Sequence, residues 1–227
     1  SDETRLLFSD AVRHHYVSAL ATIETAAGAR EDLLRDFRDA CARGVLLGAE
    51  GPVRDFFLLE GRRPGRAARL ARILVQNGLE VRRLVEPLRA TCTDVHGEVK
   101  EERVIPRGSY HIPVARPNGQ AARILLDRRV EMGKDYVERQ LQRKERRLGD
   151  EIYDVTAWSL PLAFDVGCLW AGESTPVPSE PWGGESPAEE IAGGPAGVAY
   201  LIPADDDGAL LALASWLQAG YRVHVTE

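Results

Sequence analysis

The segment from residue 55 to residue 84 is the most informative about the fold. It begins with Asp55-Phe-Phe-Leu-Leu-Glu60 and Gly61-Arg-Arg-Pro-Gly65. A helical run to Gln76 follows, and then Asn77-Gly78-Leu-Glu-Val-Arg-Arg-Leu84. Its first segment is a short apolar run, as a buried parallel strand requires. Pro64 marks the start of a helix, and Asn77-Gly78 ends that helix as a left-handed cap. A strand, a helix and a strand in this order predict a crossover connection and therefore a parallel sheet.

The same order of elements recurs near the C-terminus, where residues 198–202 and 221–225 flank a helical run with aspartates before it. A further strand is predicted at residues 109–114, followed by a helix from Gly119 to Asp127. We therefore expect an α/β fold with a mostly parallel, Rossmann-like or flavodoxin-like sheet flanked by helices. Its strands are expected near residues 55–60, 79–84, 109–114, 198–202 and 221–225.

The remaining segments suggest a division into four parts. Residues 1–50 read as a helical connector, either a hairpin or a broken helix, because apolar residues recur at helical spacing and Gly28 interrupts them. Residues 51–170 form the α/β domain, and residues 171–197 are a Gly-, Pro- and Glu-rich linker or long loop. Residues 198–227 complete the sheet or start a second domain.

Two segments inside the α/β domain have their own character. Residues 128–150 are densely charged and predict a solvated helix or a flexible insertion. Residues 153–164 are apolar, so Trp158 and Leu160, and with them Tyr153, are expected to be structural and buried.

Composition excludes several classes of protein. The chain has 227 residues with a net charge of -6, which disfavours a general nucleic-acid-binding surface. No apolar run is long enough to cross a membrane. The three cysteines, Cys41, Cys92 and Cys168, are too few and too far apart for a disulfide framework or a structural zinc site. The absence of an initiator methionine at Ser1 suggests a piece of a longer protein.

The motifs that carry chemistry are weak. His224-Val-Thr-Glu227 has a His-x-x-Glu spacing but has no third ligand, so we expect no metal site. Cys168 lacks the glycines of a nucleophile elbow, and His111 could meet Cys92 or Cys168 only through folding that the spacing does not reveal. The one candidate ligand site is the pair Arg62 and Arg63, which could receive an anion at the start of the helix that follows.

Three stretches together resemble one family: Arg30-Glu-Asp-Leu-Leu-Arg-Asp-Phe37, Gly108-Ser-Tyr-His-Ile-Pro-Val-Ala-Arg-Pro117 and Tyr153-Asp-Val-Thr-Ala-Trp-Ser-Leu-Pro-Leu162. They are similar to the region downstream of the catalytic domain in large bacterial zinc carboxypeptidases of the carboxypeptidase A type. In those proteins a helical connector leads to a domain similar to class I glutamine amidotransferases. This chain departs from the family by Arg116-Pro117 in place of Gln-Pro, and by the charged insertion at 128–150.

The resemblance implies a parent protein that is a zinc carboxypeptidase exported to the periplasm or beyond the cell. Zinc is then expected in the parent's catalytic domain and no cofactor in this chain. No catalytic residue carries over, because neither the peptidase's ligands nor the amidotransferase's cysteine elbow has a matching position. The expected partners are the parent peptidase domain and a peptide or small-molecule ligand.

Three functions therefore stay open. The first is a non-catalytic accessory domain that positions the peptidase or binds substrate. The second is an amidotransferase- or amidase-like enzyme with a degenerate site. The third is a small-ligand-binding domain that uses the crevice of its sheet.

Overall fold

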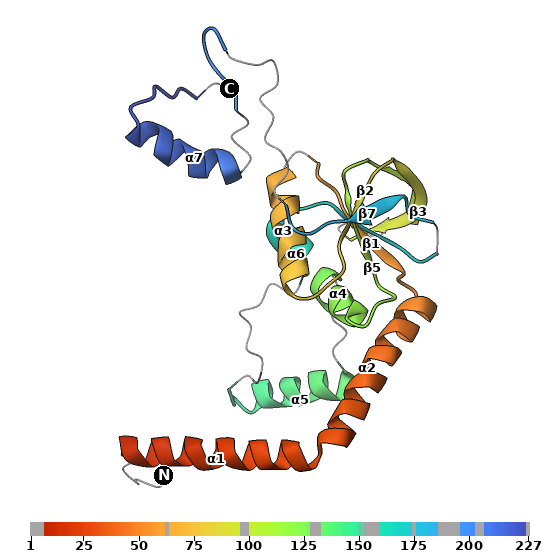
Figure 1. The fold of residues 1–227 in the computed structure, drawn as a ribbon, viewed down its shortest axis with the longest axis vertical. Coiled ribbons are helices and arrows are strands. Elements are labelled where there is room, and N and C mark those ends of the chain that lie inside the picture. The colour runs from red at the N-terminus through yellow and green to blue at the C-terminus, as the bar shows by residue number, and fades with distance from the viewer. Residues whose placement is uncertain are drawn as a thin grey trace. The chain divides into compact units, whose positions relative to one another are not determined.

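The computed structural model describes residues 7–61, 64–95, 100–127, 133–149, 151, 159–173, 176–185, 196–202 and 207–225. The chain divides into two units, Ser1–Arg43 (unit 1) and Gly44–Glu227 (unit 2). Figure 1 draws both units and labels most of their helices and strands. Tyr153 and Trp158, which the sequence predicts to be buried, lie outside the described residues.

Unit 1 consists of α1 (Phe8–Gly28) and most of α2 (Arg30–Glu50). The Asp10 carboxylate accepts a hydrogen bond from the Leu7 backbone N–H at the start of α1, 3.2 Å away. Only Ala29 separates the two helices, and its N–H still donates to the Thr25 carbonyl. The connector is therefore a broken helix, which is one of the two arrangements that the sequence predicts.

Helix α2 continues through Gly44 and Gly48 to Glu50, and both glycines lie where another part of the backbone approaches the helix. A Cβ on Gly48 would lie 2.2 Å from the Val114 carbonyl oxygen, and one on Gly44 would lie 2.5 Å from the Pro117 carbonyl oxygen. Glycine is required at both positions because backbone approaches backbone there. These contacts lie within unit 2, so they hold the last two turns of α2 against the chain that follows β5.

Unit 2 is built on a curled seven-stranded sheet with the order β4-β3-β6-β1-β5-β2-β7. Its strands are β1 (Asp55–Leu58), β2 (Arg82–Leu84), β3 (Leu88–Asp94), β4 (Lys100–Ile105), β5 (Tyr110–Pro113), β6 (Cys168–Ala171) and β7 (Ser179–Pro181). Its remaining helices are α3 (Pro64–Gln76), α4 (Gly119–Leu126), α5 (Lys134–Glu145), α6 (Leu160–Phe164) and α7 (Asp207–Gln218).

The prediction of a mostly parallel, Rossmann-like or flavodoxin-like sheet is wrong, because every pair of neighbouring strands is antiparallel. The local unit is correct: α3 connects β1 to β2, which run in the same direction. However, β5 lies between those two strands and is antiparallel to both. A crossover helix fixes the relative direction of the strands it joins and not the identity of their neighbours.

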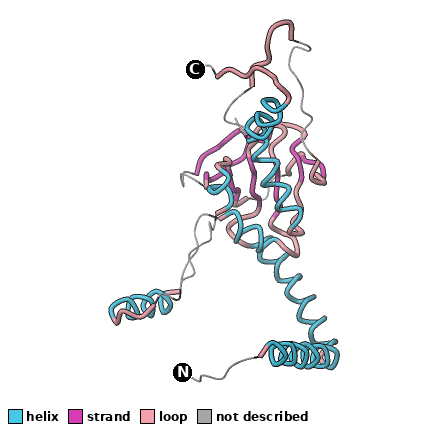
Figure 2. The backbone as a smooth tube through the Cα atoms, turned by 90° about the vertical axis from the view of Figure 1, so that its left-hand side faces the viewer, coloured by secondary structure: helices cyan, strands magenta, loops and turns pink. Residues whose placement is uncertain are grey.

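Burial on both faces of the sheet explains why the strands look parallel in the sequence. One face packs against α3, α4 and α6 through residues such as Phe56 and Leu58 (Figure 2). The other face lines the inside of the curl, where Phe57 packs with Leu169. A continuous apolar run indicates burial on both sides, which is usual in parallel sheets and here results from curling.

Several predicted boundaries are confirmed, and others are not. Gly78 has φ of 76°, and the Leu79 N–H donates to the Leu74 carbonyl, so the left-handed cap of α3 is present. The charged run contains α5, a helix without buried residues. Leu160 is half-buried and packs on the larger core, as expected.

Part of the segment read as a linker belongs to the sheet. Residues 176–185 include β7, and Trp182 is buried with its ring edge-on to the Tyr110 ring, 4.8 Å between centroids. Residues 198–202 and 221–225, in contrast, form no strand, and Val198 and Val225 are fully exposed or nearly so. High β-propensity in these segments is not sufficient, because a strand also requires a neighbour to pair its backbone.

Candidate functional site

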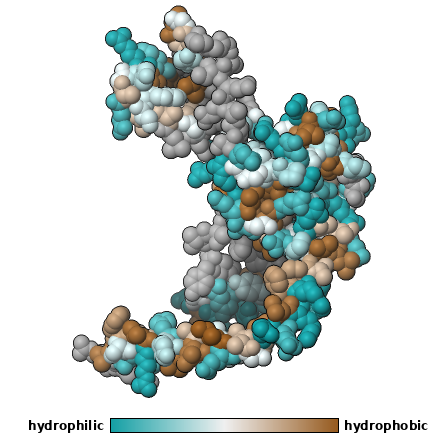
Figure 3. All heavy atoms as spheres, viewed as in Figure 1, coloured by the Kyte–Doolittle hydropathy of each residue, from teal (hydrophilic) through white to brown (hydrophobic). Residues whose placement is uncertain are grey.

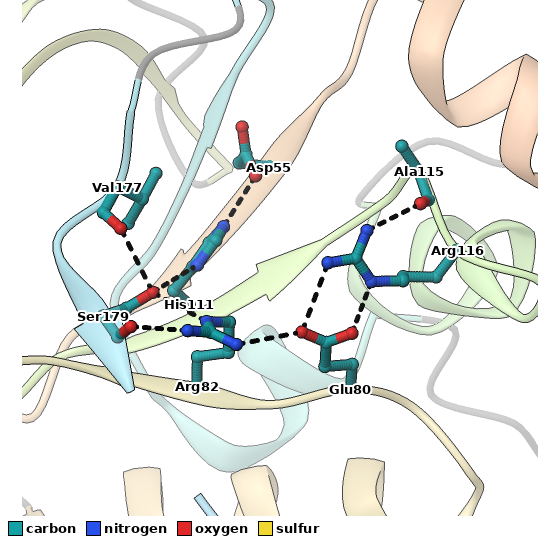
Figure 4. A network of polar contacts seen from close by, with 8 residues as sticks. All are labelled: Asp55, Glu80, Arg82, His111, Ala115, Arg116, Val177 and Ser179. Carbon is teal, nitrogen blue, oxygen red and sulfur yellow. Dashed lines mark hydrogen bonds and ion pairs between the residues drawn. The ribbon is translucent and has the colours of Figure 1, made fainter. Parts of the chain in front are cut away.

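A chain of polar side chains crosses the inner face of the curled sheet. Asp55 is the first residue of β1 and His111 lies in β5, both on the same face as Phe57 because side chains alternate along a strand. The His111 ring stacks on Phe57 with 5.3 Å between centroids. Ser179 comes from β7 at the end of the sheet, and its side chain meets His111 (Figure 4).

The distances define a continuous hydrogen-bonded chain. The Asp55 Oδ1 atom lies 2.6 Å from His111 Nε2, and His111 Nδ1 lies 3.2 Å from Ser179 Oγ. Arg82 donates from Nε to the same hydroxyl over 2.9 Å and from Nη2 to the Ser179 carbonyl over 2.6 Å. His111 is only 5% exposed, so this chain is shielded from solvent at its centre.

The network continues from Arg82 to a second ion pair. The Glu80 Oε1 atom accepts from Arg82 Nη1 and from Arg116 Nη2, each over 3.3 Å, and Arg116 Nε donates to Oε2. The hydrogen bond from Arg116 is the main reason that the pKa of Glu80 lies below its ordinary value. The Arg116 guanidinium thus holds the Glu80 carboxylate.

The thiols are not part of this network. Burial raises the pKa of Cys92 to about 11 and raises the pKa of Cys168 still further. A thiol that stays protonated near neutral pH is a poor nucleophile. His111 meets neither of them, since its two ring nitrogens contact Asp55 and Ser179.

The other residues singled out in the sequence contribute little. Arg62 and Arg63 lie outside the described residues, between Gly61 and the first residue of α3, so the anion site remains a prediction. His224 is exposed, and Glu227 lies outside the described residues. Across the described part of the chain, no three side chains of the metal-ligating types come together.

A second feature is the apolar face of α1, formed by Phe8, Val12, Tyr16, Leu20 and Ile23. At 100° per residue their spacing of four, four, four and three residues places all five within one third of the helix circumference. All five are exposed, Phe8 by 86% and Tyr16 by 68%, and α1 has no buried residue. Apolar side chains recur along this helix in Figure 3.

Comparison of the chain with protein-family models, with curated proteins and with solved structures gives no match. None of the helices in the described residues combines the length and the apolar character that a membrane span requires. The functional interpretation therefore depends on the side chains themselves.

Sequence reasoning found His111 but missed the partners that give it a role. Asp55 carried a faint signal, because it is a charged residue at the start of a strand that is otherwise apolar. Ser179 carried none, since it lies in a Gly-, Pro- and Glu-rich stretch without periodicity. Arg82 and Glu80 were read only as polar members of a strand, because their pairing depends on the neighbouring strands.

Proposed function

We propose that this chain is an accessory region, without peptidase or glutaminase activity of its own, of a zinc carboxypeptidase-like protein and that it positions the peptidase domain through the apolar face of α1. The observation that carries the proposal is that face, which is apolar from Phe8 to Ile23, over about four turns, and has no partner among the described residues. Helices in proteins gain most of their stability from packing an apolar face. A helix of this composition is therefore expected to have a docking partner.

The resemblance supports the peptidase domain as that partner. In the family that the three stretches resemble, a helical connector joins the peptidase to the region downstream. Burial of each large apolar side chain contributes about 1.5–3 kcal/mol, so the five residues of the face suffice for stable docking. The peptidase domain would then hold α1 while the sheet of unit 2 forms the body of the accessory region.

The chemistry of the thiols agrees with a region that hydrolyses neither peptides nor glutamine. A glutaminase of this type requires a reactive thiolate, and the raised pKa of Cys92 and of Cys168 opposes its formation. We therefore expect no peptidase and no glutaminase activity from the isolated chain. A degenerate amidase-like activity is the alternative that the same assays would detect, whereas binding of peptide substrate by unit 2 is the alternative that an equilibrium binding measurement would detect.

The first test is to read the coding sequence upstream of Ser1. The proposal expects a peptidase domain with a His-x-x-Glu pair and a distant third histidine. An open reading frame that encodes no such domain would contradict it.

The second test is made in the encoded full-length protein, with matched charge substitutions on two sides of α1. Ile23→Glu and Tyr16→Glu place a carboxylate on the apolar face, whereas Thr25→Glu and Ser18→Glu place one on another side of the same helix. The first pair is expected to expose the connector to limited proteolysis and to lower the melting temperature of the peptidase domain. The second pair is expected to do neither. Equal effects of the two pairs would show that the apolar face is not the docking surface.

A further inference from the structure

The ionised carboxylate of Asp55 sets the direction of donation at one end of the polar chain on the inner face of the sheet. An ionised carboxylate only accepts hydrogen bonds, so the 2.6 Å contact with Asp55 places a proton on Nε2 of His111. Nδ1 of the neutral ring is then an acceptor, and the Ser179 hydroxyl 3.2 Å away is its donor. Arg82 Nε donates into Ser179 Oγ, so the hydroxyl proton has two acceptors within reach, His111 Nδ1 at 3.2 Å and the Val177 carbonyl at 3.4 Å, and the imidazole is the nearer. Carboxylate, imidazole and hydroxyl thus stand in the order that activates a serine.

The surroundings favour transfer of that proton. His111 and Asp55 are shielded by the sheet, and electrostatic interactions are stronger away from water. The Arg82 guanidinium contacts Oγ, so it stabilises negative charge as the hydroxyl loses its proton. Ser179 is half-buried in β7, the strand at the end of the sheet.

We propose that Ser179 is a nucleophilic serine that accepts acyl groups from activated esters, with His111 as its base, Arg82 as the cation that contacts the reacting oxygen and Asp55 as a positioning residue. The proposal is independent of the docking role and adds an esterase activity to a region without peptidase or glutaminase chemistry. Aryl esters are the class assigned, because a phenolate departs with little assistance. Cleavage of an amide would require donors for the oxyanion as well as an activated serine.

The reaction balances without any further reactant. Ser179 Oγ attacks the ester carbonyl carbon while its proton passes to His111 Nδ1. The bond from the carbonyl carbon to the phenol oxygen then breaks, and His111 returns the proton to the departing oxygen. Water attacks the acyl-serine in the same way, which releases the carboxylic acid and restores the Ser179 hydroxyl.

The test uses the full 227-residue chain with two probes, p-nitrophenyl acetate and an alkyl fluorophosphonate. We expect a single phosphonyl adduct, located at Ser179 by peptide mapping, and turnover of the ester. Ser179→Ala and His111→Gln are each expected to lower turnover by about 100-fold or more. Ser109→Ala removes a buried hydroxyl that belongs to no part of this chain of hydrogen bonds, and it is expected to leave turnover unchanged.

The positioning role of Asp55 has its own readout. Asp55→Asn is expected to lower kcat by about tenfold or more with KM unchanged, since the residue acts through His111 and not on the ester. The labelling of the unmodified chain decides the proposal even if a variant fails to fold. Absence of an adduct at Ser179, or an adduct on another residue only, would overturn the proposal. The network would then serve only to hold β7 against the rest of the sheet.

Discussion

In unit 1 every large apolar side chain of the described residues is exposed, from Leu7 to Phe37, whereas in the sheet Phe56 and Phe57 are each 1% exposed. These two phenylalanines are neighbours in β1 and enter different cores, one under the helices and one inside the curl. Unit 1 has helical hydrogen bonds and surface ion pairs but no packed core. The two regions are therefore expected to respond differently to the same kind of substitution.

This comparison indicates which part of the chain is expected to fold by itself. The sheet is stabilised by area removed from water on both of its faces, so it is expected to fold without help from α1. Helices α1 and α2 contribute apolar surface that becomes stabilising only when a partner covers it. Hydrophobic residues at helical spacing are thus expected to bind a partner in α1, whereas in unit 2 they pack into the core beneath the sheet.

The sharpest contrast is expected from truncating a phenylalanine in each region. Phe56→Ala should lower the free energy of unfolding by about 3–5 kcal/mol, because the cavity lies in the larger core. Phe37→Ala, at a position 70% exposed, should change it by no more than about 0.5 kcal/mol. Denaturant unfolding of both variants measures the difference. A similar loss from Phe37→Ala would show that unit 1 has a core of its own in solution.

The break in the helical connector and its C-terminal end offer a second contrast through glycine. Gly48→Ala is expected to cost about 1–3 kcal/mol, because the new Cβ would meet the Val114 carbonyl oxygen. Gly28→Ala meets nothing within 4 Å at the end of α1, and it is expected to be neutral or stabilising by up to about 1 kcal/mol. Thermal unfolding of the pair checks both. A neutral Gly48→Ala would mean that the end of α2 does not rest on the backbone at Val114.

The elements that the sequence predicts well are those set by local patterns. Helix α3 starts at a proline and ends at the Asn77-Gly78 cap, and a strand follows it directly. The signals for both elements lie within this one segment of the sequence, so periodicity and capping suffice to find them. The direction of the sheet could not be found in this way. It depends on which distant segment lies between β1 and β2, and no local signal in the sequence of β5 identifies that neighbour.

The candidate site shows the same limit more strongly. Asp55, His111 and Ser179 are brought together by the curl of the sheet and the register of strands that are distant in sequence. The cysteines, in contrast, could be interpreted from the sequence, because isolated thiols without an elbow are usually inert. The burial of Cys92 and Cys168 agrees with that interpretation. Residues 198–202 and 221–225 failed as strands for a third reason, since their β-propensity has no partner strand among the described residues.

The Tyr110 hydroxyl is expected to make the stability of the sheet depend on pH under alkaline conditions, and no such dependence is expected from α1. Burial raises the pKa of Tyr110 to about 12, and its hydroxyl has no hydrogen-bond partner in the described structure. The unfolded chain ionises first, near pH 10, so stability is lost as the pH rises from 10 towards 12. Tyr110→Phe is expected to reduce that loss and to be neutral or stabilising by about 1 kcal/mol at pH 7. Tyr16→Phe on α1 should change neither, and an equal effect from it would contradict the assignment to Tyr110.

The smallest contrast concerns two carboxylates that each pair with arginine. The pKa of Glu80 is lowered chiefly by its hydrogen bond from Arg116, so its stabilisation is present above the ordinary glutamate pKa and is lost as the pH falls below it. Glu80→Gln is expected to cost about 0.5–1 kcal/mol at pH 7, a small value because Glu80 is partly exposed, and less at pH 3, where the carboxyl is closer to protonation. Asp32 contacts Arg35 at 2.6 Å on α2, but both side chains are mostly exposed, so Asp32→Asn should cost less than about 0.3 kcal/mol at either pH. Denaturant unfolding at the two pH values measures both variants. If Asp32→Asn costs as much as Glu80→Gln, the distance between the paired atoms alone determines how much these ion pairs stabilise the fold. The placement of Glu80 between two arginines would then add no stability.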